Sequence, residues 1–316
     1  MTTEFVASES DVGRFAPSTT GGVHPGTLLA ALLCWLDLRS RKGLVVLRLE
    51  DLDRERTKRG FVEAMERDFE WFGLDWDRSE RQTDRAPAHA EALESLVRSG
   101  RVYACGCSRS EIRAAGTEAP DGSYRYPGTC RDQVVSATSW REEKRPLRLR
   151  LESMPIELLD ESGLDLSGDA ELLFGDPILR RRDGSSSYHF ASVLDDAAVG
   201  VTRVVRGRDL APSTLPQVTL QRLMELPTPV YRHHGLFLER SGDKLSKLHG
   251  AVDVETLRGR YEADALCGMI ASYVGLVPPG TRCRPAELVD GFTWSRVAIA
   301  DVELSWSVGR GLVTTS

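Results

Sequence analysis

A glycine-rich loop between a short apolar strand and a long apolar helix constrains the fold of this chain more than any other feature. Residues 12–16 predict the strand, residues 17–26 form a loop rich in Gly, Pro, Ser and Thr, and leucines at helical spacing predict a helix over residues 27–41. Gly43 ends this helix, and the apolar run 44–49 predicts a buried strand. Because this order is typical of a βαβ unit, we expect an α/β fold with parallel strands.

The same alternation returns near the end of the chain, after a region of different composition. A strand, a helix and a strand are predicted over 201–205, 213–224 and 231–238. From about residue 101, cysteines, glycines and prolines accumulate, and short strands such as 147–151 alternate with loops. A Rossmann-like parallel sheet that is interrupted by an inserted domain accounts for this order.

Other elements complete the predicted organisation. Amphipathic helices are predicted over 58–72 and 87–99, and a helix over 263–273 stands among irregular pieces. The predicted division is residues 1–100 for the first half of a nucleotide-binding domain, 101–190 for the inserted domain, 191–250 for the second half, and 251–316 for a short, mostly helical C-terminal region.

Composition and charge exclude several classes of protein. The chain has 316 residues and a net charge of −6, which argues against indiscriminate binding to nucleic acid. Two basic clusters, 141–150 and 180–182, form either solvated surface or a local face for an RNA backbone. No apolar run is long enough for a membrane span, and the N-terminus lacks the basic-then-apolar pattern of a secretory signal. We therefore expect a cytoplasmic protein.

Two segments are suited to binding phosphates. A strand that runs into a glycine-rich loop and a helix presents free N–H groups to an anion, and Gly26 lets the backbone approach a ligand. His24 either donates a hydrogen bond to a phosphate oxygen or only caps a turn. Far along the chain, Lys244 and Lys247 stand three residues apart in a short loop, and their ammonium groups suit phosphates.

Together these segments resemble the signatures of a class I aminoacyl-tRNA synthetase. Residues 24–27 stand where that class has His-Ile-Gly-His, and residues 244–248 stand where it has Lys-Met-Ser-Lys-Ser. Thr27 replaces the second His, and Leu248 replaces the final Ser. The amino-acid sequences of residues 14–18, 48–53 and 205–210 resemble those of the glutamyl branch. The resemblance runs from about residue 12 to 250. It implies that His24, Lys244 and Lys247 are catalytic and that His24, Gly26 and Lys247 bind ATP.

A glutamate site needs two cationic partners and one anionic partner, because glutamate carries two carboxylates and one ammonium. Arg14, Arg206 and Glu50 meet this requirement, and the hydroxyl of Tyr188 adds a donor. Which arginine holds the side-chain carboxylate stays open. The resemblance implies that the whole set matches positions that the glutamyl family uses: Arg14, Phe15, Ala16, Pro17, Ser18, Glu50, Tyr188 and Arg206.

Three clustered cysteines predict a structural zinc site in the inserted domain. Cys105, Cys107 and Cys130 supply three thiolates, and a tetrahedral zinc ion requires a fourth ligand. The small glutamyl relatives use Cys-x-Cys followed by Tyr-x-x-x-Cys, which implies Tyr126 as that ligand, with Tyr124 as the alternative. The remaining cysteines are interpreted as core or incidental residues: Cys34, Cys267 and Cys283.

The zinc pattern and the length of chain after Gly250, about 66 residues, resemble the family of small paralogues called glutamyl-Q tRNA(Asp) synthetases. This resemblance implies that glutamate is activated with ATP and Mg²⁺ without tRNA. The glutamyl group is then transferred to queuosine in the anticodon stem-loop of tRNA(Asp). A monomer is expected. Three alternatives remain: a truncated glutamyl-tRNA synthetase that charges tRNA(Glu), a catalytically silent RNA-binding paralogue, and a small-molecule adenylyltransferase.

Overall fold

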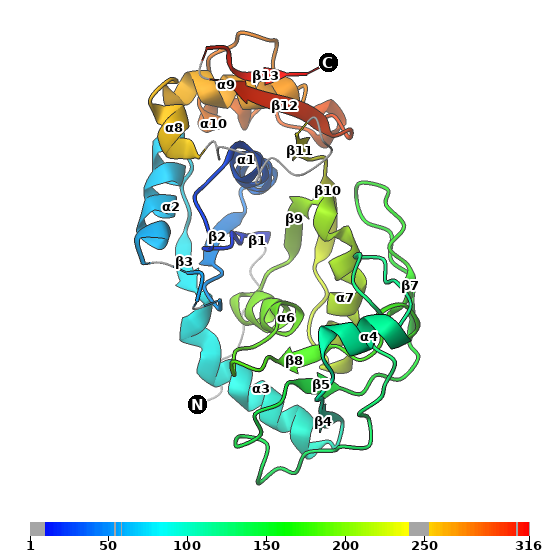
Figure 1. Cartoon of the computed structure of the whole chain (residues 1–316). Helices are drawn as coiled ribbons and strands as arrows, with labels where there is room; N and C mark the ends of the chain where they lie inside the picture. Colours follow the sequence, from blue (N-terminus) through cyan, green and yellow to red (C-terminus); the bar gives the residue numbers. More distant parts are fainter. Residues whose placement is uncertain (1–9, 54, 58, 240–252, 308, 316) are drawn as a thin grey trace. The chain divides into compact units, whose positions relative to one another are not determined.

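The computed structural model describes residues 10–53, 55–57, 59–239, 253–307 and 309–315 (Figure 1). The described residues form two compact units. The first unit contains the ranges Met1–Glu80, Val201–Arg208 and Pro229–Ser316, and the second contains Arg81–Gly200 and Asp209–Thr228. No helix among the described residues is both long enough and apolar enough to cross a membrane.

The first unit is built on a sheet in which the described residues contribute five strands. Its order is β10 (Val230–His234), β9 (Arg203–Gly207), β1 (Val12–Phe15), β2 (Leu44–Leu49) and β3 (Arg78–Arg81). The pairs β1–β2, β1–β9 and β9–β10 are parallel. The predicted α/β fold with a parallel sheet is therefore confirmed.

Helix α1 (Pro25–Ser40) connects β1 to β2 and completes the predicted βαβ unit. Pro25 starts the helix, where its missing N–H costs no intrahelical hydrogen bond. The helix ends at Ser40, and the chain turns into β2 at Gly43, where a Cβ would lie 2.7 Å from the carbonyl oxygen of Asp11. Only glycine permits this close approach, which returns the chain directly into β2.

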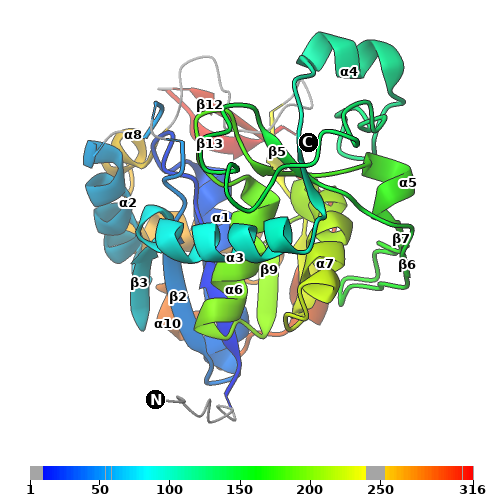
Figure 2. The ribbon, with the colours of Figure 1, turned by 90° about the horizontal axis from the view of Figure 1, so that it is seen from below.

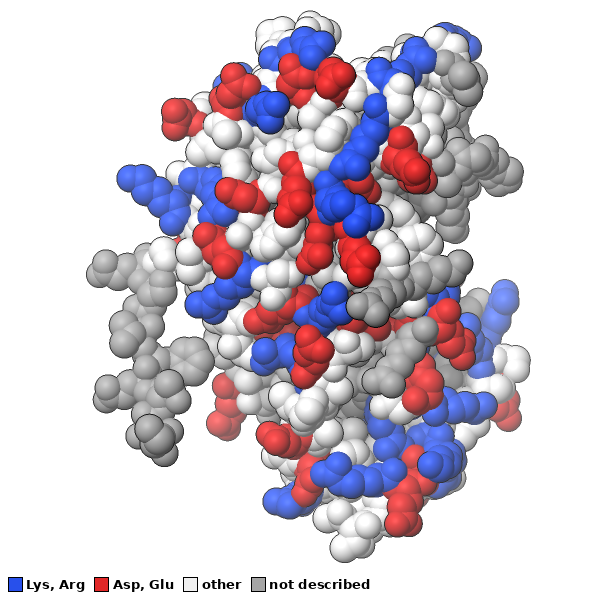
Figure 3. All heavy atoms as spheres, turned by 90° about the vertical axis from the view of Figure 1, so that its left-hand side faces the viewer, with Lys and Arg blue, Asp and Glu red and all other residues white. Residues whose placement is uncertain are grey.

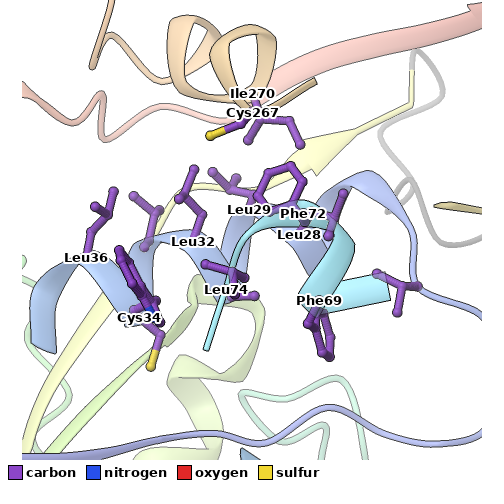
Figure 4. Packing of buried hydrophobic residues seen from close by; sticks show 14 of the residues in the cluster. Leu28, Leu29, Leu32, Cys34, Leu36, Phe69, Phe72, Leu74, Cys267 and Ile270 are labelled. Carbon is purple, nitrogen blue, oxygen red and sulfur yellow. The ribbon is translucent and has the colours of Figure 1, made fainter. Parts of the chain in front are cut away.

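Helix α1 is buried because other elements of the first unit pack around it. Helix α9 (Ala263–Tyr273) places Cys267 and Ile270 against Leu29 and Leu32 of α1 (Figure 4). Helix α2 (Arg59–Phe72) adds Phe69 and Phe72 to the same apolar cluster. The core of the first unit thus lies between one face of the sheet and α9.

The C-terminal part of the first unit combines helices with a β-hairpin. Helix α8 (Val254–Arg258), helix α10 (Pro285–Leu288) and a 3₁₀ turn, η4 (Trp294–Arg296), accompany α9. Strands β12 (Val302–Ser307) and β13 (Gly311–Thr314) pair in antiparallel fashion, and β12 also pairs with β11 (Phe237–Leu238). The irregular structure that the sequence predicts is therefore wrong for residues 302–307 and 311–314.

The strand predicted over residues 231–238 is confirmed only in part, since β10 and β11 are separate strands that belong to two different sheets. Gly235 lies between them, and a Cβ there would approach the carbonyl oxygen of Ala300 to 2.6 Å. The backbone N–H of Leu236 donates to Asp301 at 2.7 Å instead of continuing the ladder. A close contact with a distant loop therefore interrupts the strand.

The second unit combines short strands with helices. An antiparallel sheet has the order β4 (Val102–Ala104), β5 (Leu147–Leu149) and β8 (Ile178–Arg180). Helices α6 (Tyr188–Val199) and α7 (Thr214–Leu223) pack side by side (Figure 2). The remaining elements between residues 81 and 214 are η1 (Gln82–Arg85), α3 (Ala86–Arg98), α4 (Arg109–Ala115), β6 (Pro155–Ile156), β7 (Gly168–Asp169), α5 (Ala170–Phe174) and η2 (Arg208–Ser213).

Surface charge agrees with the acidic composition. On the face that carries α2, acidic and basic side chains lie side by side, and no continuous basic surface covers the described residues there (Figure 3). Broad attraction to nucleic acid therefore does not arise from this face.

Candidate active site and metal centre

The register of the parallel sheet brings charged side chains to one of its faces. Arg14 of β1 pairs with Val46 of β2, and side chains alternate along a strand, so Arg48 and Glu50 follow on the same face as Arg14. Gly13 pairs with Arg203 of β9, which puts Arg206 on this face as well. All these residues stand toward the carboxyl ends of parallel strands, where open α/β sheets bind their ligands.

The cationic residues of this face are buried. Arg14, Arg48 and Arg206 all lie in the interior, and Arg48 is enclosed completely. Nη2 of Arg48 lies 3.4 Å from Oε1 of Glu50. Sequence reasoning did not select Arg48, although an arginine inside the apolar run Leu44–Leu49 was an available signal.

The segment after β1 is fixed to the residue after β2. The N–H of Glu50 donates to the carbonyl of Pro17 at 3.0 Å, and the N–H of Thr19 donates to the carbonyl of Glu50 at 3.2 Å. Residues 16–18 therefore run beside Glu50 at the carboxyl edge of the sheet. Phe15 points the other way, since its ring packs edge-on against Phe69 in the core at 5.1 Å.

His24 is the N-cap residue of α1. Its Nδ1 accepts a hydrogen bond from the N–H of Thr27 at 3.3 Å. A neutral imidazole that accepts at Nδ1 carries its proton on Nε2, so the cap selects the tautomer in which Nε2 is a donor. A Cβ at Gly26 would lie 3.1 Å from Cε1 of His24, so glycine makes room for this ring.

The glycine-rich loop lies against the N-terminus of α8. The N–H of Val254 donates to the carbonyl of Val23 at 2.8 Å, and a Cβ at Gly22 would lie 3.3 Å from Cβ of Asp253. Lys244 and Lys247 lie outside the described residues, which end at 239 and resume at 253. The chain thus re-enters the described structure in contact with the loop that holds His24.

Tyr188 belongs to the second unit, where it is the first residue of α6. The hydroxyl of Ser187 caps this helix by accepting from the N–H of Phe190. The ring of Tyr188 lies edge-on to His189, with 5.4 Å between ring centroids. Its assignment to the glutamate site stays a prediction.

The three clustered cysteines converge in the second unit. The sulfur atoms of Cys105, Cys107 and Cys130 all lie within 4.8 Å of one another. The hydroxyl of Tyr126 lies 3.4 Å from the sulfur of Cys105 and 3.9 Å from that of Cys107. Tyr124 instead has its ring beneath the guanidinium of Arg113, so the phenol beside the thiols is that of Tyr126.

The surroundings of Tyr126 fix its position. The N–H of Cys130 donates to the phenol oxygen at 2.9 Å, and the guanidinium of Arg148 lies 3.8 Å from the ring centroid. Gly175, at φ 72°, has no room for a Cβ, which would lie 2.2 Å from the carbonyl oxygen of Tyr126. The backbone thus holds this phenol against the thiols.

The ionisation of the thiols differs within the cluster. Burial raises the pKa of Cys107 to about 11. Burial also acts to raise the pKa of Cys130, but hydrogen bonds from the Gly106 backbone and the Tyr126 hydroxyl outweigh it and lower that pKa below its ordinary value. Three sulfur donors and one oxygen donor at these separations fit a tetrahedral zinc ion.

Most arginines of the two basic clusters bind within the protein. Arg148 donates to the carbonyl of Asp176 at 2.6 Å, Arg180 donates to the carbonyl of Trp140 at 3.0 Å, and Arg145 pairs with Glu143 at 2.7 Å. Lys144 and Arg182 are exposed. Fewer cationic side chains of these two clusters are therefore available to contact RNA than the sequence predicts.

Comparison with known sequences identifies the class of protein to which this fold and this charged face belong. A family model described as "tRNA synthetases class I (E and Q), catalytic domain" matches residues 12–276. The chain belongs to this family, whose members are ligases.

Particular relatives carry a more specific name. Glutamyl-Q tRNA(Asp) synthetase of Geobacter sulfurreducens is 39% identical over 95% of this chain and 91% of its own length. The protein of the same name from Synechococcus sp. is 41% identical over 84% of this chain and 87% of its own length. Among solved structures, a glutamate tRNA ligase from Elizabethkingia meningosepticum, in complex with its amino acid, gives a TM-score of 0.77 at 25% identity, covering 94% of this chain and 67% of that one.

Proposed function

We propose that this chain activates L-glutamate with ATP, without needing tRNA, and then transfers the glutamyl group to queuosine at the wobble position of tRNA(Asp). The observation that carries the first half is the sheet register, which brings Arg14, Arg206 and Glu50 to one face of three adjacent strands. The names of the curated relatives support the second half.

The charged face of the sheet matches the charges of glutamate. Arg14 and Arg206 offer two planar guanidinium groups for two carboxylates, and Glu50 offers a carboxylate for the ammonium. Each cation is buried, so a bound carboxylate meets it with little competition from water. A glutamine side chain would leave one arginine poorly paired, so the site is expected to reject it.

The glycine-rich loop and the two lysines are proposed to hold ATP, which enters as its Mg²⁺ complex. The cap on α1 selects the tautomer with the proton on Nε2, and this N–H would donate to a phosphate oxygen. Lys244 and Lys247 would add cationic charge at the leaving pyrophosphate. These groups act by positioning and by electrostatics, since phosphoryl chemistry needs little else from the protein.

The reaction then has two balanced steps. An oxygen of the glutamate α-carboxylate forms a bond to the α-phosphorus of ATP, and pyrophosphate leaves from the same atom. A hydroxyl oxygen of the queuosine ring next forms a bond to the activated carbonyl carbon, and the bond from that carbon to the phosphate oxygen breaks. An ester and AMP result, and the hydroxyl proton passes to solvent. Glu50 and the two arginines keep the amino acid in place through both steps.

An exchange assay tests the first step. Glutamate should promote incorporation of labelled pyrophosphate into ATP in the absence of RNA, and glutamine should not. Labelled glutamate should then attach to tRNA(Asp) that contains queuosine and not to tRNA(Asp) that lacks it. Absence of exchange contradicts the first half of the proposal, and charging of tRNA(Glu) at its 3′ end contradicts the second.

The second unit is proposed to carry a structural zinc ion on Cys105, Cys107, Tyr126 and Cys130. When bound, the ion would cross-link Cys105, which follows β4, to Tyr126 and Cys130 in the loop after α4. This described loop contains no strand of its own. Its charge would also favour ionisation of the phenol of Tyr126, whose pKa burial otherwise raises.

Substitutions at the two tyrosines test this assignment. Tyr126→Phe should lower zinc affinity, measured by competition with a chromogenic chelator, while the matched Tyr124→Phe should not. Cys107→Ser should lose zinc by elemental analysis and unfold at a lower temperature, while Cys34→Ser should retain about one zinc per chain. Full zinc content in Cys107→Ser would contradict the site.

The division of the chain by function is likewise proposed. Residues 101–190 would receive the anticodon stem-loop, with exposed Lys144 and Arg182 as candidates for contacts to the RNA backbone. Residues 1–100 and 191–250 would form the catalytic domain, and 251–316 would support it. The cytoplasm is the proposed compartment, because all six cysteines are free thiols, as expected in a reducing environment.

A further inference from the structure

Arg206 has a neighbour on β10 that the proposed mechanism does not yet use. His233 is its register partner on the adjacent parallel strand, and both side chains point to the charged face of the sheet. Nε of Arg206 donates a hydrogen bond to Nε2 of His233 at 3.1 Å. Both side chains are buried, so this contact persists away from bulk water.

A second ring fixes the same guanidinium from another direction. The Cζ atom of Arg206 lies 5.4 Å from the ring centroid of Tyr231, within the range of a cation–π contact. The rings of Tyr231 and His233 are nearly parallel, with 2° between their planes and 6.4 Å between their centroids. One hydrogen bond and one ring contact thus hold the guanidinium of Arg206 from the side of β10.

The chemistry of the hydrogen bond specifies what His233 contributes. An imidazole that accepts at Nε2 is the neutral form with its proton on Nδ1. It therefore orients the arginine without adding a counter-charge. Because the guanidinium is rigid and planar, fixing Nε also fixes the direction of its other N–H groups, and bidentate binding of a carboxylate depends on that direction.

We propose that His233 is a positioning residue that orients Arg206 toward a carboxylate of the amino acid substrate. The inference rests on the proposed function, in which Arg206 binds glutamate. In this proposal His233 of β10 does not contact the substrate. It contributes to specificity by orienting the guanidinium that does.

The next residue offers a matched control. His234 is 5% exposed, against 4% for His233, and stands in the same strand. Its side chain points to the opposite face, because side chains alternate along a strand, and its Nδ1 lies 2.8 Å from the carbonyl oxygen of Gly235. Replacing either histidine removes a buried imidazole, but only His233 contacts Arg206.

The experiment compares three variants by pyrophosphate exchange on the full chain. His233→Leu should raise KM for glutamate about tenfold and leave KM for ATP within about twofold, as for loss of one charge-assisted hydrogen bond. His233→Gln keeps an acceptor and should recover most of this loss. His234→Leu should leave KM for glutamate unchanged even if it lowers the melting temperature as much as His233→Leu.

A double-mutant cycle separates positioning from general damage. Lysine has no Nε–H in the geometry of arginine, so adding His233→Leu to Arg206→Lys should change KM for glutamate by less than about twofold. Additive effects, an equal rise in both KM values, or a His233→Gln variant as poor as His233→Leu would each overturn the inference alone. A wild-type chain without glutamate-dependent exchange would instead overturn the proposed function, and the assigned substrate with it.

Discussion

Two buried arginines of β9 donate to different kinds of acceptor. The difference distinguishes an arginine that stabilises the fold from one that is proposed to bind substrate. Arg203 is 6% exposed and faces α1, where its Nε donates to the carboxylate of Asp37 at 2.8 Å. Arg206 is 5% exposed and faces the opposite side of the sheet, where its Nε donates to the neutral ring of His233. A carboxylate cancels the charge of an arginine, whereas an imidazole only directs it.

The other residues on the two faces of the sheet show the same contrast. Asp37 also accepts from the indole of Trp294 at 2.7 Å, so its ion pair ties β9, α1 and the C-terminal region together. On the other face, Arg14, Arg48 and Glu50 gather at the carboxyl edge of the sheet. One face therefore carries a buried ion pair that ties elements together, and the other carries the residues proposed to bind glutamate.

The largest effect that tests this contrast is expected at Asp37. Asp37→Ala leaves a buried Arg203 without the carboxylate that neutralises it, so we expect the free energy of unfolding to fall by about 3–5 kcal/mol. Denaturation in urea measures this loss. The control is Asp75→Ala, whose carboxylate pairs with Arg39 but is 73% exposed, and it should cost less than about 1 kcal/mol. Equal losses would contradict the structural role of the Asp37 face.

Glu50→Gln is expected to show the reverse behaviour. The amide keeps an acceptor for Arg48 but loses the charge that is proposed to pair with the substrate ammonium, so kcat/KM for glutamate should fall about 30- to 100-fold. The free energy of unfolding should change far less than in Asp37→Ala. Exposed Glu70 on α2 supplies a control, since Glu70→Gln should leave both quantities unchanged. A stable Glu50→Gln enzyme with ordinary glutamate kinetics would refute the glutamate site.

The smallest effect is expected in the glycine-rich segment. Gly26→Ala places a Cβ 3.1 Å from the ring of His24, so the ring must shift, and kcat/KM for ATP should fall about fivefold. Alanine also favours the helix, so stability should not decrease. Gly60→Ala on α2, outside this loop, is the control, because no atom lies within 4 Å of its added Cβ. Identical kinetics in both variants would remove His24 from the ATP site.

The elements that sequence analysis predicted best are those governed by local periodicity. The predicted strand 44–49 coincides with β2, and the predicted helix 263–273 coincides with α9. Both have a single apolar pattern that tertiary contacts only reinforce. The charge count and the resemblance to the glutamyl branch grouped Arg14 with Arg206, and the register of the sheet places both on one face.

The features that were missed depend on contacts between distant residues. Gly235 breaks the strand predicted over 231–238 because residues near Ala300 approach it closely, which no local pattern reveals. The role of His233 depends on register with β9, which is fixed only in the folded sheet. In contrast, residues 302–307 alternate apolar and polar side chains, and this local pattern alone is typical of a strand such as β12.

The pairing of β11 with β12 joins the C-terminal hairpin to the strand that precedes, in sequence, the two lysines proposed to bind ATP. Strand β11 ends at Leu238, immediately before the segment that contains Lys244 and Lys247, and its described neighbour in the sheet is β12. The β12–β13 hairpin thus holds the last described strand before the two lysines in the sequence. A fusion partner or deletion that disrupts residues 302–314 is accordingly expected to weaken adenylate formation while the charged face of the sheet remains intact.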